Sequence, residues 1–159
     1  MPLIGLEDFY KTLDNLKENA DKVAEQAVLV GAEKIRAQAV LMTPIFTGEL
    51  RQSIKTKSEK TGKTVKGIVY TNKAYAAYVE FGTGPKGEES DHSDVSPNIA
   101  VSYKQKGWSY QDAEGNWHHT RGQPANPFMY PAARDRQEVA MKAVADTFAK
   151  AIKKGLKDD

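Results

Sequence analysis

The sequence predicts an α+β fold, with a long N-terminal helix and a C-terminal helix packed on a small antiparallel sheet with hairpins. Two periodicities support the helices, because apolar residues recur every three or four positions over 6–42 and again over 132–156. A change of period supports a hairpin, because residues 54–71 alternate in polarity and are rich in β-branched and aromatic side chains around a glycine. We expect these elements to form a single domain over residues 1–159.

The long helix at 6–42 carries a narrow apolar stripe of the kind that packs against another helix. Its members are Leu6, Phe9, Leu13, Leu16, Ala20, Val23, Ala27 and Val30. Thr43 ends the helix, since a residue that precedes a proline avoids the helical region. At 1.5 Å per residue the helix spans about 54 Å. This length exceeds what a core of this size needs, so we expect part of the stripe to contact a second copy of the chain.

Segment 43–83 is expected to form a turn, a basic hairpin and a short helix. Thr47 is the predicted N-cap of the first helical turns, and Gly62 lies in the hairpin turn. Gly82 suits a left-handed cap at the end of the short helix. In order, the predicted elements are a helix at 48–53, the hairpin at 54–71 and a helix at 75–81.

Segment 84–123 is expected to be a variable loop that contains a hairpin. Residues 84–98 are acidic, polar and rich in glycine, so we expect them to be a mobile loop. Apolar and aromatic residues return at 99–103 and at 108–120, which predicts further strands, the second patch being a hairpin that turns at 112–116.

Segment 124–159 combines a proline-rich stretch with the C-terminal helix. Pro124 and Pro127 forbid both a helix and a central strand, and Phe128 is expected to anchor the chain after them. Pro131 suits the first turn of the following helix. The apolar side of that helix is predicted to carry Met141, Val144, Phe148 and Ile152.

Composition limits the classes of function. The formal net charge of +2 does not favour a nucleic-acid binder, and the absence of cysteine excludes disulfides, thiolate metal sites and cysteine nucleophiles. No basic segment precedes an apolar one in the manner of a signal peptide, and no apolar run approaches the ~18 residues of a membrane span. We therefore expect a soluble protein made in the cytoplasm.

Charge is distributed unevenly along the chain. Residues 51–66 are basic, whereas residues 80–94 hold five acidic residues against one lysine. These segments could steer one subunit onto the next, or they could be ordinary solvated faces. The basic hairpin at 51–66 could also bind nucleic acid without sequence specificity. The candidate interface residues are Arg51, Lys55, Lys57, Lys60, Lys63 and Lys66 on one side, and Glu88, Glu89, Asp91 and Asp94 on the other.

Signals for catalysis or metal binding are weak. His92, His118 and His119 lack the spacing of a metal site, because neighbours in a strand point to opposite faces. The glycine-rich stretch 82–87 follows a predicted helix rather than a strand, unlike a phosphate-binding loop. Glu80 is flanked by apolar residues, and a fold-maintaining role is favoured over a catalytic one. We expect no catalytic residue, metal or cofactor.

Three stretches in order resemble the gene-product-ten-like tail-component family of tailed bacteriophages and prophages. They are residues 43–54 with a proline and a Thr-Gly-x-Leu turn, residues 75–83 with a Val-Glu-Phe-Gly-Thr turn, and residues 123–132 with a Pro-Phe-x-x-Pro-Ala segment that leads into the last helix. The matching residues are Pro44, Thr47, Gly48 and Leu50; Glu80, Phe81, Gly82 and Thr83; and Pro127, Phe128, Pro131 and Ala132. Residues 84–123 depart from the family pattern, and contacts particular to this chain are expected there.

The resemblance implies a non-catalytic structural protein of the phage neck, which joins head to tail during virion assembly as a ring of identical subunits. Its implied partners are other copies of itself and neighbouring neck, connector or tail-tube proteins, and its implied location is the virion. We expect Thr47 and Gly48 to set a turn that brings the long helix onto the sheet. Glu80 is expected to fix the turn at Gly82, Thr83 and Gly84, and Pro127 and Phe128 to dock the last helix.

Overall fold

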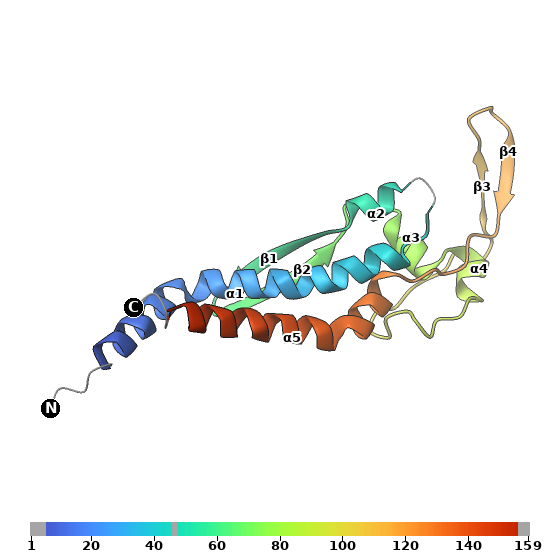
Figure 1. Ribbon diagram of the computed structural model, residues 1–159. Helices are drawn as coiled ribbons and strands as arrows, with labels where there is room; N and C mark the ends of the chain where they lie inside the picture. The colour runs from blue at the N-terminus through green and yellow to red at the C-terminus, as the bar shows by residue number, and fades with distance from the viewer. Residues whose placement is uncertain (1–5, 46–47, 156–159) are drawn as a thin grey trace. The chain divides into compact units, whose positions relative to one another are not determined.

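The computed structural model describes residues 6–45 and 48–155, with side chains described at 19–45 and 48–154. It has an α+β architecture with two separate two-stranded antiparallel sheets (Figure 1). In chain order the elements are α1 (Leu6–Met42), α2 (Glu49–Ser53), β1 (Lys55–Thr61), β2 (Thr64–Tyr70), α3 (Ala76–Phe81), α4 (Gly84–Glu88), β3 (Trp108–Gln111), β4 (Trp117–Thr120) and α5 (Met129–Gly155).

The chain divides into two compact units. Unit 1 comprises Met1–Ala37, Lys55–Tyr70 and Arg136–Asp159, and unit 2 comprises Gln38–Ile54 and Thr71–Asp135. The α+β class, the long first helix, both hairpins and the final helix that the sequence predicts are all confirmed.

In unit 1, α1 and α5 approach closely because the residues between them are small. A Cβ atom at Gly31 would lie 2.7 Å from Val144 Cγ2 and 3.1 Å from the Ala140 carbonyl oxygen. Ala27 and Ala140 are buried as well. Figure 1 shows the two helices running along each other over this stretch. The contact therefore depends on tight packing, in which dispersion contacts are most numerous.

The β1–β2 hairpin packs on α1 through one of its faces. The register pairs Thr56 with Val69, Ser58 with Gly67 and Lys60 with Val65, so these side chains share the face toward α1. A Cβ at Gly67 would lie 2.4 Å from the Val28 carbonyl oxygen, so the strand backbone touches the helix backbone there. Thr56 also donates a 3.0 Å hydrogen bond to Glu33 of α1.

The exposed side of α5 differs from the sequence prediction. Met141, Phe148 and Ile152 are 64%, 38% and 45% exposed, whereas Ala140 is buried. Large apolar residues therefore lie on the outer side of the helix. The tight contact with α1 selects small residues for the inner side, which a pattern of apolar spacing does not reveal.

In unit 2, the predicted N-cap is wrong, and the loop predicted over 84–98 is wrong only over 84–88. Helix α2 begins after Gly48, which has a φ of 79° and is the N-cap, and Thr47 lies outside the described residues. Residues 84–88 form α4, with Gly84, Pro85 and Gly87 buried, so this part of 84–98 is an ordered helical turn. The patch at 99–103 does not form the predicted strand.

None of the helices, over the residues that the structure describes, is both long and apolar enough to cross a membrane.

Candidate functional site

The best-defined site in unit 2 is a clasp around the buried carboxylate of Glu80. Helix α3 buries Ala76 and Glu80, and the Glu80 side chain is only 6% exposed. Its Oε2 accepts hydrogen bonds from the backbone N–H groups of Phe128 at 2.8 Å and Met129 at 2.9 Å. Its Oε1 accepts one from the N–H of Tyr130 at 2.9 Å. These amides belong to the start of α5, where backbone N–H groups lack partners within the helix.

Glu80 thus caps a helix that begins 49 positions further along the chain. A carboxylate is favourable at a helix N-terminus because the aligned peptide dipoles leave partial positive charge there. The three bonds also satisfy a charge that would be costly to bury unpaired. Glu80 therefore holds the start of α5 rather than the 82–84 turn expected from the sequence.

Backbone pairing extends the clasp on both sides of Glu80. Thr83 N–H donates to Gln123 O at 2.9 Å, and Gln123 N–H donates back to Thr83 O at 3.2 Å. Asn126 N–H donates to Val79 O at 2.8 Å, and Gln123 Nε2 donates to Tyr78 O at 2.8 Å. The second and third motif stretches therefore lie against each other over most of their length.

Gly82 is required at the centre of this pairing. Its φ of 73° is left-handed, and a Cβ there would lie 2.6 Å from the Ala125 nitrogen and 2.7 Å from the Gly87 Cα. Both the conformation and the space exclude a side chain. The glycine predicted as a helix cap is therefore also a point of backbone contact.

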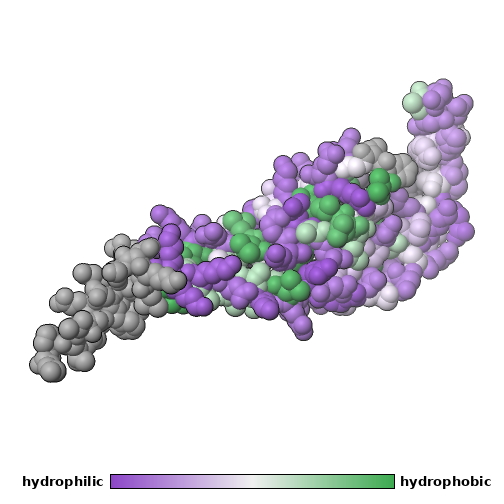
Figure 2. All heavy atoms as spheres, viewed as in Figure 1, coloured by the Kyte–Doolittle hydropathy of each residue, from purple (hydrophilic) through white to green (hydrophobic). Residues whose placement is uncertain are grey.

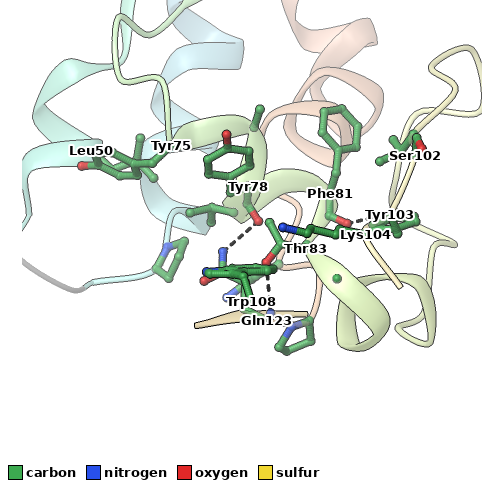
Figure 3. A pocket seen from close by; sticks show the side chains of 18 of the residues that line it. Leu50, Tyr75, Tyr78, Phe81, Thr83, Ser102, Tyr103, Lys104, Trp108 and Gln123 are labelled. Atoms are coloured by element: carbon green, nitrogen blue, oxygen red, sulfur yellow. Dashed lines mark hydrogen bonds between the residues drawn. The ribbon is translucent and has the colours of Figure 1, made fainter. Parts of the chain in front are cut away.

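An open groove of about 1240 Å³ lies beside the clasp, and all three motif stretches line it (Figure 3). We call it the motif groove. The first stretch contributes Pro44, Gly48, Glu49 and Leu50, the second contributes Tyr75, Ala77, Tyr78, Val79, Phe81, Gly82 and Thr83, and the third contributes Gln123, Pro124 and Asn126. Figure 3 draws Leu50 and Tyr75 at one end of it and Ser102 and Tyr103 at the other.

The motif groove is mainly apolar and open to solvent. Tyr75 and Tyr78, which line it, are 40% and 59% exposed. Figure 2 shows hydrophobic side chains gathered at the surface over α2 and α3. Exposed apolar patches of this kind are typical of contact surfaces between proteins.

The variable segment closes part of the groove wall. Tyr103 donates its hydroxyl to the Phe81 carbonyl oxygen at 2.9 Å, and Trp108 lies along the same wall. Burial raises the pKa of Tyr103 above its usual value because it disfavours the phenolate, and the Glu88 carboxylate adds to the effect. Neither wall residue was expected in a site, because Tyr103 and Trp108 stood out in the sequence only as members of the apolar and aromatic patches at 99–103 and 108–120.

The candidate interface residues on the basic side separate into groups. Lys55, Lys57 and Lys66 point to the outer face of the β1–β2 hairpin, and Lys63 lies in its turn. Lys60 faces the other way and forms an ion pair with Asp21 of α1. Arg51 lies in α2 rather than on the hairpin, and its Nε donates a 2.8 Å hydrogen bond to the Thr43 carbonyl oxygen. Among the described side chains, Lys55, Lys63 and Lys66 have no ion-pair partner.

The acidic candidates have partners inside unit 2. Glu89 pairs with Arg121 at 3.0 Å, and Asp94 pairs with Arg134 at 2.7 Å. Glu88 accepts a hydrogen bond from Gln105. Asp91 accepts one from Ser93 N–H, which lowers the pKa of its carboxyl group. These contacts join the four acids to other residues of unit 2, while the mobility expected of 84–98 stays a prediction.

The histidines serve local contacts. His118 pairs with Asp112 and stacks on Tyr110, while His92 stacks on Tyr103. Within the described residues, no group of three or more His, Asp or Glu side chains is placed to hold a metal ion. Gly87 N–H bonds to Thr83 O and Lys86 N–H bonds to Arg121 O, so these amides of the glycine-rich stretch are committed within the fold.

Residues 7–82 match the family described as "Bacteriophage HK97-gp10, putative tail-component". The comparisons with curated proteins and with solved structures found no match. The matched range includes the first motif stretch and the second as far as Gly82, and the third lies against the second in the Glu80 clasp. This match confirms the resemblance found in the sequence, so residues 7–82 are similar to the gene-product-ten-like family of phage tail components.

Proposed function

We propose that this chain is a structural neck or minor tail component that joins head and tail during virion assembly, as a homo-oligomeric ring. The match of residues 7–82 to a phage tail-component family supports a place in the virion among other phage structural proteins. The observation that carries the proposal furthest is the motif groove. Residues from all three motif stretches, far apart in the sequence, line one exposed apolar surface.

In this proposal the motif groove receives a neighbouring protein of the neck or tail. Its two exposed tyrosines can bury aromatic area at little conformational cost, because each has only two side-chain torsions. The outer lysines of the β1–β2 hairpin add a second contact through charge, since Lys55, Lys63 and Lys66 have no ion-pair partner among the described side chains. Electrostatic contacts of this type act mainly on the rate and specificity of association.

The test replaces Tyr75 and Tyr78 together by serine and measures incorporation of the chain into phage particles. Loss of incorporation with an unchanged melting temperature is expected. Tyr110→Ser is the matched control, because Tyr110 is 49% exposed on β3 and does not line the groove. Normal particles from the double variant would contradict the role of the groove.

A second candidate is non-specific binding of nucleic acid by the β1–β2 hairpin. The specific observation is that Lys55, Lys57 and Lys66 share one outer face, with Lys63 at the tip. Such binding would weaken steeply with salt, because each phosphate contact releases counterions. Retention on DNA at low salt that is lost in Lys63→Glu/Lys66→Glu would favour this function, and no retention would exclude it.

A further inference from the structure

We infer that the outer face of α5 in unit 1 is a contact surface for a second copy of the chain, paired antiparallel helix to helix. The face consists of Met141, Ala145, Phe148 and Ile152, and we call it the α5 stripe. At about 100° per residue these four positions fall within a sector of about 60°. Figure 2 shows hydrophobic side chains reaching the surface among hydrophilic ones along α1 and α5.

The α5 stripe is separate from the face that packs on α1. That inner face carries Ala140 and Val144, which meet Gly31. The stripe is turned from it by about 90° on a helical projection. Met141 remains 64% exposed and Ile152 45% exposed, so large apolar side chains lie in solvent where no described element covers them. Exposed apolar stripes at spacings of three and four are typical of helix–helix contacts.

Charges beside the stripe select a second copy as the partner. Lys142 and Asp146 lie on the flank of the stripe that is turned away from α1. Neither has an ion-pair partner among the side chains that the structure describes. In an antiparallel pair, Lys142 of each copy can face Asp146 of the other, whereas a parallel pair would place like charges at the same level.

One register satisfies both the charges and the apolar residues. The midpoint of positions 142 and 146 is 144, and the midpoint of 141 and 148 is 144.5. An antiparallel pair centred there therefore places Phe148 against Met141 of the other copy while the two ion pairs form. Ala145 then lies next to the two-fold axis, where its small side chain allows the helices to approach.

This pairing goes beyond the ring of the proposed function. A two-fold contact uses the same patch on both copies and closes after two subunits, whereas a ring needs a heterologous contact. The two proposals can therefore fail independently. The α5 pair requires a dimer, and the ring requires a larger closed assembly that uses other surfaces.

Sedimentation equilibrium of the full chain over a range of concentrations is the first test. A concentration-dependent dimer is expected, and Met141→Glu should raise its dissociation constant at least tenfold. Val139→Glu is the matched control, because Val139 is 43% exposed on another face of the same helix and its replacement should leave the dimer intact. A monomer at all concentrations would overturn the inference. An oligomer that Met141→Glu does not change would also overturn it, but that result would remain compatible with the proposed ring.

Cross-linking is the second test, and it uses the absence of cysteine from the chain. Oxidised Ala145→Cys should form a disulfide-linked dimer, because the two thiols meet near the axis. Lys150→Cys, also exposed but on the opposite side of the helix, should not. Lys142→Glu should weaken the dimer and Lys142→Glu/Asp146→Lys should restore it. Equal cross-linking at both positions, or no rescue by the charge swap, would overturn the antiparallel register.

Discussion

Unit 1 and unit 2 differ in the kind of contact that stabilises each of them internally. In unit 1, small residues let backbones touch, as at Gly31 against α5 and Gly67 against α1. In unit 2, short elements are joined by hydrogen bonds that converge on the buried carboxylate of Glu80 and on the Thr83–Gln123 pair. Long periodic elements thus gain stability from close packing, and short irregular ones from polar groups that bridge distant parts of the chain.

The difference predicts where each unit is vulnerable. Close packing fails when a side chain is added at a point of backbone contact. A polar clasp fails when one acceptor is removed, because several buried donors then lose their partner together. The expected effects below run from the largest to the smallest.

Glu80→Ala should cause the largest loss. Three N–H groups at the start of α5 lose their acceptor, so the free energy of unfolding should fall by about 4 kcal/mol. Glu80→Gln keeps one acceptor oxygen, so its free energy of unfolding should fall by only about 2 kcal/mol. Denaturant melts measure both. Glu89→Gln is the control, since Glu89 is 65% exposed in its ion pair and its removal should cost at most about 0.5 kcal/mol. Equal losses at the two positions would show that there is no clasp.

Gly67→Val should have the next largest effect, in unit 1. The new Cβ would start 2.4 Å from the Val28 carbonyl oxygen, so the hairpin must shift away from α1 at a cost of about 3 kcal/mol. Thermal unfolding followed by circular dichroism measures the change. Lys66→Val, on the outer face of the same strand, should be nearly neutral. If the two valines were equally tolerated, the hairpin would not be packed as described.

Breaking the Lys60–Asp21 ion pair should have a small effect. Both side chains are partly solvated, at 38% and 65% exposed, so a double-mutant cycle of Lys60→Met and Asp21→Asn should give a coupling of at most about 0.5 kcal/mol. A coupling above about 2 kcal/mol would mean that unit 1 depends on polar contacts as unit 2 does.

Acid should loosen the β3–β4 turn without unfolding the chain. A hydrogen bond from His118 lowers the pKa of Asp112 below its usual 3.8, with help from the N–H of Asn116 and then from that of Glu114. A lowered pKa means that the carboxylate stabilises the turn above about pH 4 and that this contribution is lost as the pH falls below that value. The protection of the Asn116 amide, measured as its exchange rate relative to an unfolded chain at the same pH, should therefore fall between pH 4 and pH 2. If the Asn116 amide exchanged equally fast at pH 6 in the native chain and in Asp112→Asn, this role of Asp112 would be contradicted.

Sequence patterns predicted the elements of unit 1 well, since α1 and the β1–β2 hairpin follow helical and strand periodicities. They did not predict which side of α5 is buried, because Gly31 and Ala140 select for small size and not for hydrophobicity. In unit 2 the motif residues were identified, but the partners of Glu80 were not, since they lie 48 to 50 positions away. Helix α4 was missed because its glycines and proline are buried by tertiary contacts that composition does not encode.

Hydrogen exchange of Glu80→Gln, compared with the native chain, tests the clasp most directly. The clasp predicts that the amides of Phe128, Met129 and Tyr130 exchange faster in the variant, while the amides of α1 around Ala27 and Gly31 keep their protection. Unchanged exchange at these three amides, or an equal loss of protection in both units, would contradict the account.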